Sequence, residues 1–114
     1  MLLQISPLSL ADRPLIIRSF AGEDHVAEVD GLRAGWILQA ESTPVGEWWW
    51  SLTGPSCALA RVPNTGRCPS FEKAKAELAA AYSLWLEWAL RQQNPVSWYS
   101  RSRDHQVAPP AAAV

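Results

Sequence analysis

The sequence is poor in the features that most often indicate a function. It holds two cysteines and two histidines in 114 residues, and its formal net charge at pH 7 is −1. A nearly neutral chain has no overall field that attracts nucleic acid or an anionic membrane. No apolar run approaches the roughly 18 residues that span a bilayer, so we expect no membrane segment.

The standard catalytic and metal-binding motifs are also missing. The chain contains no Gly-x-Ser-x-Gly elbow, no His-Glu-x-x-His helix and no glycine-rich phosphate loop. Cys57, Cys68, His25 and His105 lack the close cysteine pairs typical of zinc sites. We therefore predict a non-enzymatic protein with no metal and no cofactor. An enzyme ranks third among our hypotheses and depends on His25, or on Cys68 if a nearby helix start lowers its pKa.

The chain start is apolar but has no basic region and no small-residue cleavage signature, so we expect no secretory signal. These features favour the cytoplasm. In that compartment Cys57 and Cys68 are expected to be free thiols rather than a disulfide.

Tryptophan is the residue that this sequence has in excess. The chain has seven, and three of them are consecutive at Trp48-Trp49-Trp50. An aromatic run that ends at Gly54-Pro55 is typical of a strand, and a strand sends successive side chains to opposite faces. We expect Trp48 and Trp50 to face the core and Trp49 to face outward.

The alternation of apolar and turn residues predicts four strands, which we place at 15–20, 25–30, 36–41 and 47–53. Residues 54–70 are expected to form a loop, with a short strand near 58–62 as an alternative. The predicted fold is α+β, a three- to four-stranded antiparallel meander packed against one long amphipathic helix. We predict one domain over 15–94, preceded by an irregular lead-in at 1–14 and followed by a flexible tail at 95–114.

The helix is predicted over 71–93. Ser70 suits its N-cap, and Asn94-Pro95 ends it. Its apolar residues recur at helical spacing as one stripe: Phe71, Ala74, Leu78, Tyr82, Trp85 and Ala89. This stripe is expected to pack on the sheet face that carries Trp36, Leu38, Trp48, Trp50 and Leu52.

Two groups of aromatic and aliphatic residues remain as candidates for an interface. Trp49 with Ile37 would form an apolar patch on the outer sheet face, unless a loop covers that face. Leu84 and Trp88 lie four apart on the side of the helix opposite its buried stripe. Either the C-terminal residues around Trp98 fold back onto them, or they contact another chain, most simply a second copy.

A nucleic-acid-binding accessory domain is the alternative function. Arg61, Arg67 and Lys75 cluster in the sequence around the loop and the first helical turns. Together with Trp49 they would combine cations for phosphates with an aromatic surface for bases.

Residues 36–90 resemble small uncharacterised proteins of α-proteobacteria. The resemblance is carried by Trp48 through Gly54, which matches a W-x-W-S-x-T-G strand, and by Ser70 through Lys75, which matches the S-x-E-x-A-K start of a helix. It covers about half of the chain and implies no function. In outline the layout is also similar to the arm-type DNA-binding domain of phage integrases and to the plant ethylene-response DNA-binding domain. Strands 36–41 and 47–53 depart from both, because they lack the Arg and Lys residues that those domains use on DNA.

Overall fold

The computed structural model describes residues 2–19, 24–39, 46–57, 60–92 and 94–99. None of the helices in these ranges is long and apolar enough to cross a membrane. In chain order the elements are β1 (Leu2–Ile5), the 3-10 helix η1 (Pro7–Leu10), β2 (Leu15–Ser19), β3 (His25–Val29), β4 (Leu32–Gln39), β5 (Trp48–Leu52), β6 (Thr65–Cys68), α1 (Phe71–Gln92) and β7 (Val96–Tyr99).

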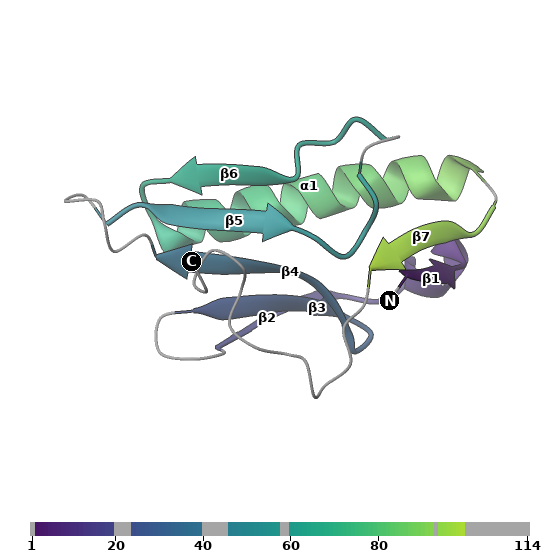
Figure 1. Ribbon diagram of the computed structural model, residues 1–114, viewed down its shortest axis with the longest axis horizontal. Coiled ribbons are helices and arrows are strands. Elements are labelled where there is room, and N and C mark those ends of the chain that lie inside the picture. Colours follow the sequence, from purple (N-terminus) through teal and green to yellow (C-terminus); the bar gives the residue numbers. More distant parts are fainter. Residues whose placement is uncertain (1, 20–23, 40–45, 58–59, 93, 100–114) are drawn as a thin grey trace.

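Five strands form one antiparallel sheet in the order β2-β3-β4-β5-β6. The long helix α1 lies across one face of this sheet (Figure 1). The other two strands, β1 and β7, form a small antiparallel sheet near the C-terminal end of α1 (Figure 1). The predicted α+β class with one long helix is therefore confirmed, but the sheets contain more strands than the predicted three or four.

Helix α1 begins and ends where the sequence predicts. The Lys73 backbone N–H donates to the Ser70 hydroxyl at 3.2 Å, which satisfies one of the amides that a helix start leaves without a partner. The helix ends at Gln92, shortly before Asn94-Pro95. Its buried residues form one stripe on the side toward the sheet: Ala74, Leu78, Ala81, Tyr82, Trp85 and Ala89.

The first hairpin also agrees with the prediction. Strand β2 covers the predicted run at 15–20 within the described residues, and β3 ends at Val29, one residue before the end of the predicted run at 25–30. The turn into β4 places Asp30 at φ 52° and Gly31 at φ 79°, the left-handed pair that a two-residue hairpin turn requires. β4 starts at Leu32 and is longer than the predicted strand at 36–41.

The pairing of β4 with β5 corrects the predicted sheet faces. Ile37 lies opposite Trp50, and Leu38 lies opposite Trp49. Because directly opposed residues share a face, Ile37 points toward α1, where it is fully buried in the core.

The predictions that Ile37 joins Trp49 on the outer face and that Trp36 and Leu38 face the helix are therefore wrong. The run Trp36-Ile37-Leu38 is apolar at every position, so its hydrophobic pattern does not specify a register. A shift of one residue exchanges the two faces of the whole strand. Trp36 and Leu38 are nevertheless buried, although they lie outside the main core cluster.

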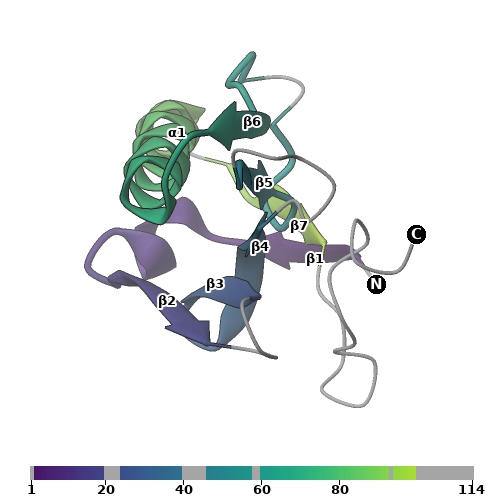
Figure 2. The same cartoon turned by 90° about the vertical axis from the view of Figure 1, so that its left-hand side faces the viewer.

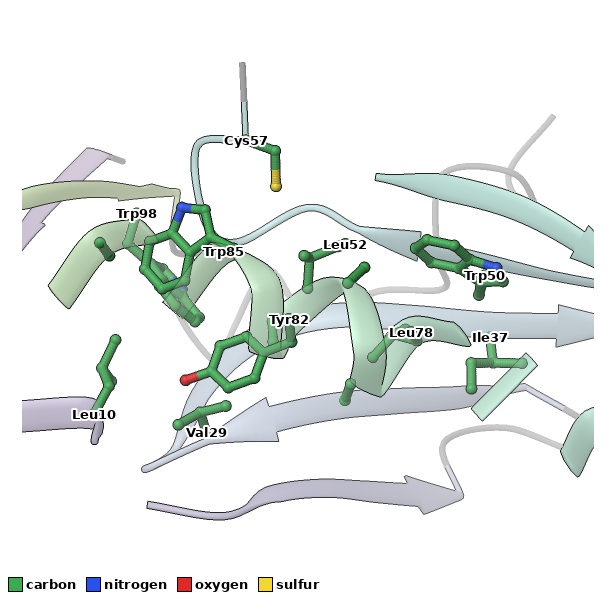
Figure 3. Packing of buried hydrophobic residues seen from close by; sticks show 14 of the residues in the cluster. Leu10, Val29, Ile37, Trp50, Leu52, Cys57, Leu78, Tyr82, Trp85 and Trp98 are labelled. Atoms are coloured by element: carbon green, nitrogen blue, oxygen red, sulfur yellow. The ribbon is translucent and has the colours of Figure 1, made fainter. Parts of the chain in front are cut away.

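The core at the C-terminal half of α1 is aromatic (Figure 3). The Trp85 and Trp98 rings meet edge to face with centroids 5.7 Å apart, and Tyr82 lies 6.0 Å from Trp85. Both indole N–H groups are satisfied, since Trp85 donates to the Ser56 carbonyl and Trp98 to the Arg33 carbonyl, each at 3.1 Å. These bonds tie α1 and β7 to the loop after β5 and to β4.

Strands β1 and β7 contradict the predicted lead-in at 1–14 and tail at 95–114. Residues 2–5 pair with residues 96–99, and Trp98 is fully buried. The Tyr99 N–H also donates to the Gly54 carbonyl at 2.7 Å. Local pattern could not reveal this pair, because its two strands are separated by 90 residues of sequence and each has only four residues. The rest of the predicted tail lies outside the described residues.

Strand β6 falls within the segment predicted as a loop. Its sequence, Thr-Gly-Arg-Cys, has no apolar alternation, and only pairing with β5 makes it a strand. Gly66 is required there, because a Cβ would lie 2.5 Å from the Trp50 indole nitrogen. The alternative strand near 58–62 is not formed at Ala60 and Arg61, which lie in a turn, while residues 58–59 are outside the described ranges.

Candidate functional site

The outward side of α1 carries a row of apolar residues, which we call the outer ridge: Ala76, Ala80, Leu84 and Trp88. Residues four apart in a helix stack along one side, so these four form a continuous row. Ala76 and Ala80 are exposed, Leu84 is 54% exposed, and Trp88 is half-buried. In Figure 2, α1 lies at the margin of the molecule, and no other described element lies beyond its outer side.

Trp88 joins the outer ridge to the folded C-terminal strand. It borders an open hollow of about 220 Å³ whose other lining residues are Ser56, Gln92, Asn94, Pro95, Val96 and Ser97. Trp88 also packs against the core cluster, and it shares this hollow with Val96 and Ser97 of β7, whereas Leu84 is 54% exposed. Of the two alternatives for Leu84 and Trp88, folding back of the C-terminal residues accounts in part for Trp88, which lies beside the same hollow as β7. It does not account for Leu84, which stays exposed.

A second hollow lies on the other side of the Asn94-Pro95 turn. Its volume is about 410 Å³, and it is bordered by Ser6, Pro7, Leu8, Leu90, Asn94 and Pro95. Leu8 is 77% exposed at its rim. Among the described residues, no charged side chain lines either hollow.

On the outer sheet face, Trp49 has a different neighbour from the one predicted. Leu38 lies opposite Trp49 on β4, and the Arg67 guanidinium lies over the Trp49 ring at 4.4 Å from its centroid. A cation over an indole face is a favourable contact of about 0.5–1 kcal/mol at an exposed site. Trp49 is half-buried, and its indole N–H finds no acceptor among the described residues.

The three basic residues of the nucleic-acid alternative do not form one cluster. Arg67 lies on the outer face of β6 beside Trp49. Lys75 belongs to the first turns of α1, on the opposite side of the sheet, where it pairs with Glu72 at 3.0 Å and lies over Phe71 at 4.8 Å. Arg61 is exposed in the turn before β6, at φ 56°. Arg67 therefore lies next to Trp49, whereas Lys75 contacts a different aromatic ring, that of Phe71, on the other side of the sheet.

The two cysteines are buried thiols. Burial raises the pKa of Cys57 to about 11. Burial, together with a hydrogen bond to Glu77, also raises the pKa of Cys68 to about 11. The hypothesis that the helix start lowers the pKa of Cys68 is therefore wrong, because Cys68 is 2% exposed and beside a carboxylate. A thiol with so high a pKa is a poor nucleophile at neutral pH.

His25 lies in an aromatic cluster rather than among charged residues. Its ring is 4.4 Å from Phe71 and 6.4 Å from Trp48, measured between centroids. Within the part of the chain that the structure describes, no three His, Cys, Asp or Glu side chains are close enough to hold a metal ion. His105 lies outside that part.

Comparison of the chain with protein-family models, with curated proteins and with solved structures finds no match. The functional assignment therefore depends on this structure alone. Sequence reasoning identified Leu84 and Trp88 but missed Ala76 and Ala80. Their spacing of four from Leu84 was the signal that could have found them.

Proposed function

We propose that this protein is a small non-enzymatic interaction module that self-associates through the outer ridge of α1. The observation that carries the proposal is the exposure of Leu84, at 54%, in an apolar row with Trp88. Apolar surface that stays uncovered in a folded domain often marks an interface, and tryptophan is enriched at the energetic centres of interfaces.

Two observations favour the outer ridge over the sheet face as the interface. The Ile37 side chain is in the core, so it cannot contribute to an interface. Trp49 is less suited than Leu84, because Arg67 already covers one side of its ring. A non-enzymatic role is supported by the two thiols, whose raised pKa values disfavour nucleophilic chemistry.

The test is the mass of the protein in solution, measured by light scattering after size exclusion at low and moderate salt. We expect a dimer that persists in salt, since its interface is mainly apolar. Leu84→Ala and Trp88→Ala should shift the equilibrium toward monomer. Ile16→Ala is the matched control, because Ile16 is 49% exposed on β2, away from the ridge. Thermal unfolding of each variant checks that the fold is kept. A monomeric wild type, or a dimer that neither ridge variant weakens, would refute the proposal.

The alternative is a nucleic-acid-binding accessory domain, and one observation favours it. Arg67 and Trp49 form a cation–aromatic pair on the outer sheet face, the combination that contacts phosphates and bases. Titration of tryptophan fluorescence with single-stranded DNA tests this function. Binding that falls steeply with salt and is lost in Arg67→Gln, but kept in Lys75→Gln, would place the site on this face. An unchanged signal would exclude it.

A further inference from the structure

The outer sheet face is buried along its middle, although α1 covers the opposite face. Val26 lies opposite Trp36 in the pairing of β3 with β4, and Trp36 lies opposite Ser51 in the pairing of β4 with β5. Leu38 shares this face, because it is two residues from Trp36 on β4. The exposed fractions are 3% for Val26, 7% for Trp36, 6% for Leu38 and 8% for Ser51. A side chain on an open sheet face keeps part of its surface in water, so this burial requires a second layer.

The described helices and strands do not supply this layer. In Figure 1 the outer sheet face is turned toward the viewer with α1 behind the sheet, and no described helix or strand passes in front of the middle of β4. Val26, Trp36 and Leu38 are also absent from the core cluster that contains the buried stripe of α1. They are buried within a single copy of the chain, so a second copy is not needed to cover them.

The covered strip is narrow. At the two edges of the same face, the Arg18 side chain on β2 is 63% exposed, and Thr65 and Arg67 on β6 are exposed. The buried strip therefore spans β3, β4 and β5, which is about 10 Å at the usual separation of strands. This width suits one extended segment, whereas a partner protein in a stable interface covers a much larger area.

We propose that residues 107–114 of this chain are that segment, and that they pack over Val26, Trp36 and Leu38. Their sequence, Val-Ala-Pro-Pro-Ala-Ala-Ala-Val, carries no charged side chain. Consecutive prolines favour the polyproline II conformation, which leaves backbone carbonyls without internal hydrogen bonds, and such segments dock on aromatic surfaces. The Trp36 indole N–H is buried and has no acceptor among the described residues, so it is available to donate to one of these carbonyls.

The end of β7 brings the segment within reach of this face. The Tyr99 N–H donates to the Gly54 carbonyl at 2.7 Å, and the Gly54 N–H donates to the Ala34 carbonyl at 2.8 Å. The chain therefore leaves β7 close to Ala34, two residues before Trp36. Residues 100–114 can span up to about 50 Å when extended, and β4 is only about 27 Å long. Docking replaces the flexible tail that the sequence predicts, and it is independent of self-association through the outer ridge.

The first experiment locates the segment in the full chain. A spin label on Ala112→Cys should broaden the NMR methyl signals of Val26 and Leu38 more than those of Leu84, because the broadening falls steeply with distance. A label on Ala80→Cys in the outer ridge is the control and should reverse this order. With the Ala112→Cys label, broadening at Leu84 that equals or exceeds that at Leu38 would overturn the proposal.

The same label shows which copy supplies the segment. Cys57 and Cys68 are buried and should not take the label. In a second sample, isotope-labelled wild type is mixed with spin-labelled chains that carry no isotope. We expect no broadening at Leu38 in this mixture. Broadening there would assign the segment to another copy and overturn docking within one chain.

The second experiment tests the contact with Trp36. Pro109→Asp with Pro110→Asp places two charges against an apolar face, so the Trp36 indole N–H should exchange with solvent at least about tenfold faster in NMR. Ser102→Asp with His105→Asp is the control, since it adds two charges outside the segment and should leave the rate unchanged. An unchanged rate in the proline variant would overturn the proposal. If thermal unfolding shows that this variant does not fold, the spin-label experiment, which changes one alanine, still decides.

Discussion

Trp98 offers the sharpest test of the fold, because the sequence pattern placed it in a flexible tail while the structure buries it completely. Its indole N–H donates to the Arg33 carbonyl at 3.1 Å, and its ring meets Trp85 edge to face. The substitution Trp98→Phe keeps an aromatic ring in the core but removes this donor.

The expected cost follows from these two contacts. A buried carbonyl that loses its donor costs about 1–3 kcal/mol, and the space left by the smaller ring costs about 1 kcal/mol. The free energy of unfolding should therefore fall by about 2–4 kcal/mol. At about 4 °C per kcal/mol for a domain of this size, the melting temperature should drop by about 8–16 °C.

Thermal and urea unfolding measure the effect, and Trp49→Phe is the matched control. Trp49 is half-buried, and its indole N–H has no acceptor in the described part of the structure. The control should therefore lose no hydrogen bond and cost less than about 1 kcal/mol, mostly through its contact with Arg67. Equal melting temperatures for the two variants would show that β7 is not packed against the core.

Three further predictions concern buried titratable groups. The Tyr82 hydroxyl is buried without a hydrogen-bond partner among the described residues. Tyr82→Phe should therefore leave the free energy of unfolding unchanged or raise it by up to about 1 kcal/mol, measured by urea unfolding at pH 7. A clear loss of stability would show that the hydroxyl has a partner. Burial raises the pKa of Tyr82 to about 12 from 10.0. Because the folded-state value is the higher one, the stability linked to Tyr82 is present below pH 10 and lost as the pH rises toward 12, and Tyr82→Phe should remove that loss. Cys57 and Cys68 should resist a thiol reagent at pH 8 until urea unfolds the chain, and rapid labelling of the folded protein would contradict their burial.

The elements that the sequence predicts well are those with local and unambiguous patterns. Helix α1 has its apolar stripe, its Ser70 cap and its proline stop within one continuous segment. The hairpin of β2 and β3 is bounded by turn residues on both sides. The same local reasoning identified Leu84 and Trp88 as interface candidates, because they are apolar residues that do not fit the period of the buried stripe.

The candidate site was predicted only in part. Leu84 is exposed as expected. Ile37 lies on the opposite sheet face from the one predicted, because the strand around it is apolar on both sides and its pattern does not specify a face. Arg67 was expected to act with Lys75, and the sheet separates them. Residues that are close in sequence lie on opposite faces once β6 pairs with β5.

The sequence by itself determined the α+β class, the extent of the long helix and the exposure of Leu84, because each of these depends on periodicity within one segment. Only the tertiary structure decided the register of β4, the strand at β6 and the pairing of β1 with β7. These features depend on which distant strand supplies the hydrogen-bond partners, and on which face then meets α1. A short strand with no clear alternation, such as Thr65–Cys68, acquires its conformation from its neighbour rather than from its own residues.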